Sequence, residues 1–225
     1  MTATGIPTRD IHSKTPFHYN RIAGRGLERL CALSDGLFAI AMTLIVLEIH
    51  VPSHLTVRTE AALWASLVAL GPRISTYLLS FLTLGIFWVG QQTQLGQFSR
   101  TDRHLTWIHL AWLSLVAIMP FSTGLLAEFT TFRLALLLYW ANIALLGVMA
   151  FWSWAYAESH ELVKDDVPPE VGHAIRKRIM TAQLLYAIGA MLCVFSTYWS
   201  MAFIVLVQLN YAIAPRIPGL SKLTA

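Results

Sequence analysis

The chain contains few charged residues and almost no cysteine. Only 12% of its 225 residues are Asp, Glu, Lys or Arg, whereas an ordinary soluble domain carries roughly 25%. The two cysteines, Cys31 and Cys193, form neither a CxxC pair nor a zinc-type spacing with histidine, which excludes a disulfide framework and a structural zinc site. The basic residues form no continuous stripe, which argues against a nucleic-acid partner.

The sequence also lacks the residue groups that intramembrane enzymes use. Glu48 and Glu128 are both expected at helix ends near the outer boundary, so they do not form a catalytic carboxylate pair. The eight tryptophans are spread along the chain, as interfacial anchors and packing groups are. We therefore expect no enzyme activity, no cofactor and no bound metal.

Long apolar runs dominate what remains. The chain is 56% hydrophobic with a mean hydropathy of +0.58, too apolar for a soluble fold of this size. A transmembrane helix needs about 20 apolar residues. The chain contains six apolar runs near this length, which predict an all-α membrane protein with six spans. A shorter piece, 61–70, is either an extension of the second span or an interfacial helix. The spans are expected at 33–49, 74–94, 105–127, 134–157, 179–196 and 199–214.

Lysine and arginine predict the orientation and the domains. Thirteen of the sixteen fall in the N-terminal tail, the second-to-third connection, the fourth-to-fifth connection and the C-terminal tail. The positive-inside rule then places both termini in the cytoplasm of a multi-pass cell-membrane protein. No early apolar core with a cleavage site occurs, so the first helix is expected to be retained. We expect a cytoplasmic tail at 1–28, a transmembrane domain at 29–214 and a second cytoplasmic tail at 215–225. The connection 158–178 is interpreted as a solvated loop.

The first apolar helix has one purely aliphatic face. At 100° per residue, its members lie within about 40° of Ile40, and Thr43 flanks them. Ser34 and Asp35 project more than 100° away from Ile40, so we expect them to point toward neighbouring helices. The aliphatic stripe consists of Leu33, Ile40, Leu44, Leu47 and Val51.

A carboxylate at the entrance of this helix requires a partner. A buried Asp35 stays charged only beside a cation or several donors, and Arg29 is able to reach it within the chain or across a subunit boundary. Such a network would fix the rotation of the helix. A rigid helix with a smooth aliphatic face suits a hydrophobic constriction, because apolar rings gate a pore by dewetting.

At these residues the chain resembles the transmembrane protein 175 family of potassium-permeable channels, in particular its prokaryotic six-helix members. The family signature is Arg-x-x-x-Phe-Ser-Asp, and this chain has Arg29, Leu33, Ser34 and Asp35, with leucine in place of phenylalanine. The segments LLSFLTLGIFWVGQQ and IMPFSTGLLAEF are also similar to the second helix and the end of the third.

The resemblance implies a homotetramer whose first helices line a central pore without a TVGYG filter. By position, Ile40 would form the narrowest ring, and Leu44 and Leu47 further rings. Thr43 would supply a hydroxyl ring that contributes to selectivity. Potassium and other monovalent cations would be the permeant ions, and Glu48 would attract them at the outer mouth.

The resemblance also assigns a structural network. Arg29, Ser34 and Asp35 would hold helices together rather than touch ions. Family members often carry a His-His pair after the tryptophan of the second helix, whereas here Trp88 is followed by Gln91 and Gln92. Glutamine cannot become an imidazolium, so pH sensitivity through that site should be weakened. His109 stands where asparagine is common and would return an imidazole from another helix.

A secondary transporter of small ions or solutes is the main alternative function. Transporters are typically built from repeats and broken helices with polar residues at the membrane centre. The polar residues expected near the midplane here are few and lie on separate helices. They include Asn142 and Gln183, which are interpreted as interhelical hydrogen-bond partners rather than ligands.

Overall fold

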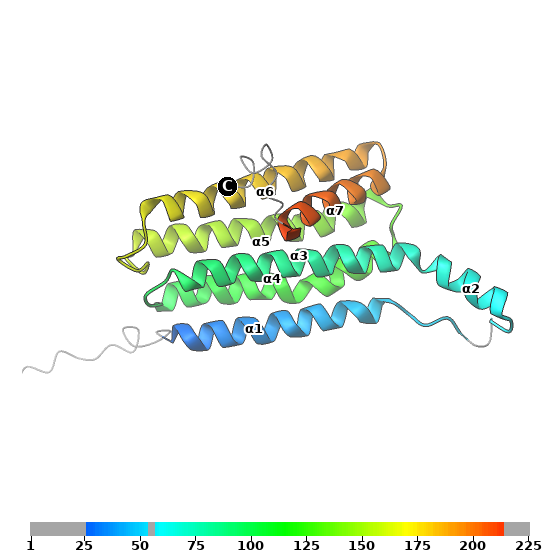
Figure 1. Cartoon of the computed structure of the whole chain (residues 1–225), viewed down its shortest axis with the longest axis horizontal. Helices are drawn as coiled ribbons and strands as arrows, with labels where there is room; N and C mark the ends of the chain where they lie inside the picture. The colour runs from blue at the N-terminus through cyan, green and yellow to red at the C-terminus, as the bar shows by residue number, and fades with distance from the viewer. Residues whose placement is uncertain (1–25, 54–56, 214–225) are drawn as a thin grey trace, which may run out of the picture.

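A computed structural model describes residues 26–53 and 57–213, and in these residues the chain is helical apart from its connections and one isolated bridge between Phe98 and Val163. Figure 1 shows the long helices running side by side, with α1 along one edge of the bundle. The elements are α1 (Leu27–Leu44), the 3-10 helix η2 (Ile45–Glu48), α2 (Glu60–Ala69), α3 (Gly71–Gly96), α4 (Arg103–Glu128), α5 (Arg133–Ser159), α6 (Pro169–Met191), the 3-10 helix η3 (Leu192–Val194) and α7 (Thr197–Ile213).

Five of the helical segments in the described part of the chain are long and apolar enough to cross a membrane. The expectation of an all-α, multi-pass membrane protein is therefore confirmed. The helix predicted as the sixth span is present as α7. The part of it that the structure describes has 17 residues, or about 26 Å at 1.5 Å per residue.

The interpretation of 158–178 as a solvated loop was wrong for its second half. Helix α6 begins at Pro169, ten residues before the predicted span. Proline suits the first helical turn, because the N–H group that it lacks has no partner there. Arg176 on this helical extension pairs with Glu158 at the end of α5. This extension was not predicted from the sequence, because it contains many polar residues and lies outside the apolar run.

The apolar piece 61–70 forms a separate short helix. Thr59 caps α2 by accepting a hydrogen bond from the Ala62 N–H. Helix α2 ends at Ala69, and Leu70 alone separates it from the first residue of α3. None of the residues of α2 is buried. Figure 1 shows it projecting past the end of the bundle.

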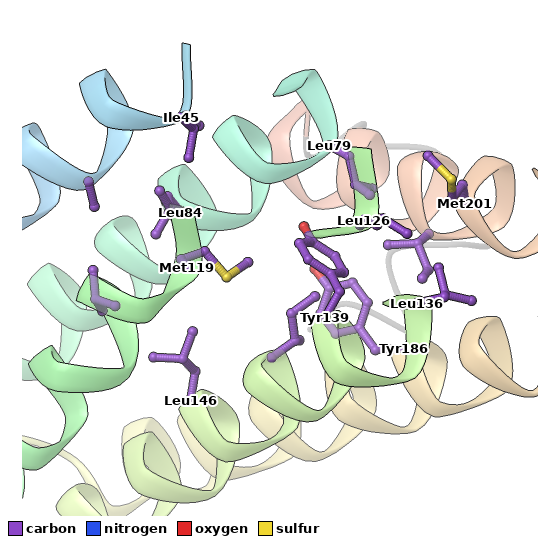
Figure 2. Close-up of a cluster of buried hydrophobic side chains, with 14 of the residues drawn as sticks. Ile45, Leu79, Leu84, Met119, Leu126, Leu136, Tyr139, Leu146, Tyr186 and Met201 are labelled. Atoms are coloured by element: carbon purple, nitrogen blue, oxygen red, sulfur yellow. The ribbon is translucent and has the colours of Figure 1, made fainter. Parts of the chain in front are cut away.

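The main core lies between α3, α4, α5, α6 and α7, and α1 adds Phe38 and Ala41 to it. Figure 2 shows Tyr139 and Tyr186 facing one another within it, among aliphatic side chains. Tyr139 is fully buried, and its hydroxyl lies 2.9 Å from Thr83 Oγ1 and accepts from Ser80 Oγ at 3.3 Å. Gln208 of α7 also donates to Thr83 Oγ1. These polar contacts fix the relative rotation of three helices where lipid offers no hydrogen bonds.

Helices α6 and α7 approach closely at Gly189. A Cβ atom placed there would lie 2.8 Å from Ile204 Cγ1 and 3.1 Å from Phe203 Cδ1. The Gly189 carbonyl oxygen also accepts a hydrogen bond from Ser200 Oγ. A small residue at a helix crossing permits such an approach in membranes.

We expect Gly189→Leu to destabilise the protein by about 1–3 kcal/mol, the usual cost of overpacking a filled core. The neighbouring Ile188→Leu is the matched control, since Ile188 is 41% exposed. Unfolding of the purified protein in mixed detergent micelles measures both. Equal unfolding midpoints for the two variants would contradict the close crossing.

Candidate functional site

One face of α1 is packed against the bundle. Leu30, Ser34, Phe38, Ala41 and Ile45 are buried and recur every three or four residues. The Phe38 ring packs on Trp112 of α4, with 5.5 Å between the ring centroids. This face therefore fixes which side of α1 is turned away from its own chain.

The opposite face of α1 is the aliphatic stripe, and it is uncovered in the single chain. The α-helical geometry ends at Leu44, and the chain continues as the 3-10 helix η2. Since residues three apart eclipse one another in a 3-10 helix, Leu47 remains in line with Leu44. Val51 lies beyond η2 and is not helical, so its predicted place on the stripe was wrong. The uncovered members are Leu33 (46% exposed), Ile40 (57%), Leu44 (44%) and Leu47 (65%).

Thr43 is exposed beside this stripe. Its hydroxyl lies 3.0 Å from the Ala39 carbonyl oxygen and 2.8 Å from that of Ile40, to which it donates. The hydroxyl hydrogen is thus used inside the helix. The oxygen keeps its acceptor capacity for whatever faces α1.

Two side chains near the middle of α1 are hydrogen-bonded to α3. Gln91 Nε2 donates to Ser34 Oγ at 2.8 Å, and both residues are buried. Trp88 Nε1 donates to Asp35 Oδ1 at 2.9 Å, and Gln92 Nε2 donates to the same oxygen. We call this set of five residues the α1–α3 clamp. The clamp brings together four predicted site residues and adds Gln92. Gln92 follows Trp88 by four residues and so lies on the same face of α3, which could have indicated its role.

Arg29 is not part of the clamp in the single chain. No ion pair joins Arg29 and Asp35 within the described residues, so the first of the two predicted routes, a direct contact within the chain, is absent. The donors of Asp35 are Trp88 and Gln92 instead. Arg29 is exposed, and at 100° per residue it projects within about 20° of Ile40.

His109 lies apart from the clamp but shares a cavity with Gln91. It is buried, and its Nδ1 atom lies 3.2 Å from the Leu105 carbonyl oxygen and 3.5 Å from Ser153 Oγ. Both residues line a cavity of about 100 Å³ between α3, α4, α5 and α6. The imidazole and the Gln91 amide therefore line the same cavity.

Glu48 is the last residue of η2, which follows α1, and it lies against α4. A Cβ atom at Gly124 would lie 2.6 Å from the Glu48 carboxylate, so the glycine makes room for this side chain. Next to it, Arg73 Nη2 pairs with Glu128 at 2.6 Å and Arg73 Nη1 lies 2.9 Å from His50 Nδ1. The ends of α1, α3 and α4 thus meet in a charged cluster.

Comparison with known proteins identifies the family. The model for the endosomal/lysosomal potassium channel TMEM175 matches residues 29–120. A potassium channel of Streptomyces collinus is 41% identical over 101 residues, which cover 45% of this chain and 48% of that protein. The chain thus matches about half the length of this relative.

Two comparisons with Chamaesiphon minutus extend over most of the chain. A potassium channel of this organism is 31% identical over 189 residues, covering 82% of this chain and 93% of the relative. The crystal structure of its lysosomal potassium-selective channel TMEM175 homolog superposes with a TM-score of 0.72 at 30% identity, over 85% of this chain and 98% of that one. The family comprises ion channels rather than enzymes or transporters. The chain therefore belongs to the TMEM175 family and is a member of its prokaryotic branch.

Proposed function

We propose that the chain is a potassium channel in which four copies surround one pore and α1 lines it. The observation that carries this proposal is the aliphatic stripe of α1, which no other part of the described chain covers. In the single chain this stripe lies at the outside of the helix bundle, so one copy does not enclose it. Four copies related by cyclic symmetry would close a ring, with each stripe facing the axis.

Ile40 forms the constriction in this proposal. Four isoleucine side chains at one level would leave an opening too apolar to hold water when the helices are close. Leu44 and Leu47 would add further rings above it. Potassium gives up its water more readily than sodium, so a ring of this kind favours potassium through the cost of dehydration. The preference is moderate because no carbonyl array replaces the lost water.

The α1–α3 clamp would hold the stripe toward the axis. Ser34 and Asp35 are bonded to α3 on the side of α1 away from Ile40, so a rotation of α1 breaks these bonds. Arg29 projects beside the stripe and would reach a carboxylate of the adjacent subunit. Opening is then a rotation or tilt of α1 that withdraws Ile40 against the resistance of the clamp.

The positions of the charged residues support an inward-facing N-terminus in the cell membrane. Arg29, Arg103 and Lys164 lie at one end of the antiparallel bundle, together with Arg176–Arg178. Arg73 and Arg133 lie at the other end. Under the positive-inside rule the first end is cytoplasmic. The cluster around Glu48 then lies at the outer mouth, where it would attract cations.

Potassium flux through proteoliposomes tests the function. Vesicles that contain the purified chain and a potassium gradient should acidify or alkalinise when a proton ionophore is added, because proton movement balances potassium movement. Flux should exceed that of empty vesicles and should be larger with potassium than with sodium. A folded tetramer that carries no flux contradicts the proposal.

We expect Thr43→Val to lower the potassium-to-sodium permeability ratio by about two- to threefold, since an oxygen ring that offsets part of the dehydration cost is removed. Reversal potentials under bi-ionic conditions give the ratio. Thr93→Val is the matched control, because Thr93 is an exposed threonine on α3 whose hydroxyl also donates to the carbonyl oxygen four residues earlier. An unchanged ratio in Thr43→Val would remove this residue from the pore.

A further inference from the structure

The cavity that holds Gln91 and His109 lies inside each protomer, away from the aliphatic stripe. Its volume is about 100 Å³. Its lining residues come from α3, α4, α5 and α6. Exposed Thr93 and Arg178 line it from α3 and α6 and mark its mouth at the proposed cytoplasmic side.

The surface of the cavity is mostly apolar, although seven of its sixteen lining residues are polar or charged. Phe87, Trp112, Ile179 and Ala182 supply apolar surface from three helices. Gln91 is 95% buried, since its exposed fraction is 5%, and its Oε1 atom has no hydrogen-bond partner. A buried amide oxygen without a partner costs about 1–3 kcal/mol, so the site gains from an occupant that donates a hydrogen bond.

The size of the cavity limits the occupant. Water takes about 30 Å³ per molecule in the liquid, and an apolar cavity of 150 Å³ in another protein binds benzene. The present cavity therefore holds an apolar body of a few carbon atoms. Ligand sites typically combine an apolar lining with a small number of placed polar groups.

We propose that this cavity is a binding site for a small neutral amphiphile, a short alcohol whose hydroxyl donates to Gln91 and whose carbon chain lies against Phe87 and Ile179. The same Gln91 side chain donates through Nε2 to Ser34 of α1. An occupant therefore contacts the clamp directly and holds the Gln91 amide in its present orientation. Binding in the cavity stabilises the observed position of α1.

The effect on conduction rests on the proposed function, whereas the binding does not. Since the occupant favours the position in which Ile40 forms the constriction, it lowers potassium flux. We expect a reduction of about fivefold at saturation, the lower end of the usual coupling between two sites.

The probe is 2-bromoethanol, whose bromine is located by anomalous scattering in crystals of the full-length protein. A bromine peak between Gln91, Phe87 and Ile179 is expected. Gly90→Leu should abolish this peak, because Gly90 lines the cavity and a Cβ atom there meets nothing within 4 Å, so that leucine fills the space. Gly96→Leu is the matched control, since Gly96 lies on the same helix with equal room and does not line the cavity.

Flux with and without 2-bromoethanol supplies the second readout. Each variant is compared with its own ligand-free flux. The alcohol should inhibit the wild type and Gly96→Leu and leave Gly90→Leu unaffected. Water alone in the cavity, or a bromine peak that persists in Gly90→Leu, overturns the site. A peak without inhibition of a conducting channel means binding at crystal concentration only and overturns the coupling. If the wild type carries no flux even without the alcohol, the proposed channel function is contradicted. The bromine peak then decides alone whether the cavity is a binding site.

Discussion

Ile40→Asn is expected to raise potassium flux by about tenfold and to bring the potassium and sodium permeabilities close together. An amide ring holds water where the isoleucine ring excludes it. Ions then cross the constriction with more of their hydration shell. A barrier lower by roughly 1.4 kcal/mol multiplies a rate by ten. Single-channel or vesicle currents under bi-ionic conditions measure the conductance and the ratio together.

Val46→Asn is the control for this substitution. Val46 is also an exposed β-branched residue, in the 3-10 helix η2 that follows α1, and its exposed fraction is 44% against 57% for Ile40. With three residues per turn in η2, Val46 projects roughly 120° away from Leu44 and Leu47, off the aliphatic stripe. Its variant should conduct like the wild type. Equal behaviour of the two variants would place the pore axis on another face.

The orientation of α1 could be predicted from its own residues. Buried and exposed positions follow the helical period, so Ser34 lies on the side of α1 away from Ile40, as the angles require. The transmembrane helices could also be predicted from the sequence, because each requires a long apolar run. Only the second part of helix α6 could be predicted in this way, since its first turns carry Arg176–Arg178 and extend beyond any apolar run.

The partners of Asp35 could not be derived in the same way. Trp88 and Gln92 lie 53 and 57 residues away in the chain, and their contacts depend on how α3 is rotated against α1. Local periodicity contains no information on that rotation. The nearby Arg29 was the obvious candidate by charge, yet neutral N–H donors from α3 reach the carboxylate in the single chain. The change to 3-10 geometry at Ile45 could not be predicted either, because the apolar run continues across it.

Asp35→Ala is expected to destabilise each protomer by about 2 kcal/mol, because two donors lose a charged acceptor and such hydrogen bonds contribute roughly 1.5–3 kcal/mol each before solvent exposure reduces them. Trp88 and Gln92 would no longer bind α1, and Ser34 with Gln91 would hold its rotation alone. The stripes would then face the axis less uniformly. We therefore expect a smaller tetramer fraction by native mass spectrometry and a lower Tm in detergent.

Asp35→Asn separates the hydrogen bonds from the charge. Asparagine keeps a carbonyl oxygen that accepts from Trp88 and Gln92, but it cannot pair with a cation. If the clamp acts through these two donors, Asp35→Asn retains most of the stability that Asp35→Ala loses. If Arg29 of an adjacent subunit is the decisive partner, both variants lose the tetramer, and Arg29→Gln should reproduce that loss. A tetramer of wild-type stability in Asp35→Ala would show that α1 is held by its apolar packing through Phe38 and Ile45 instead.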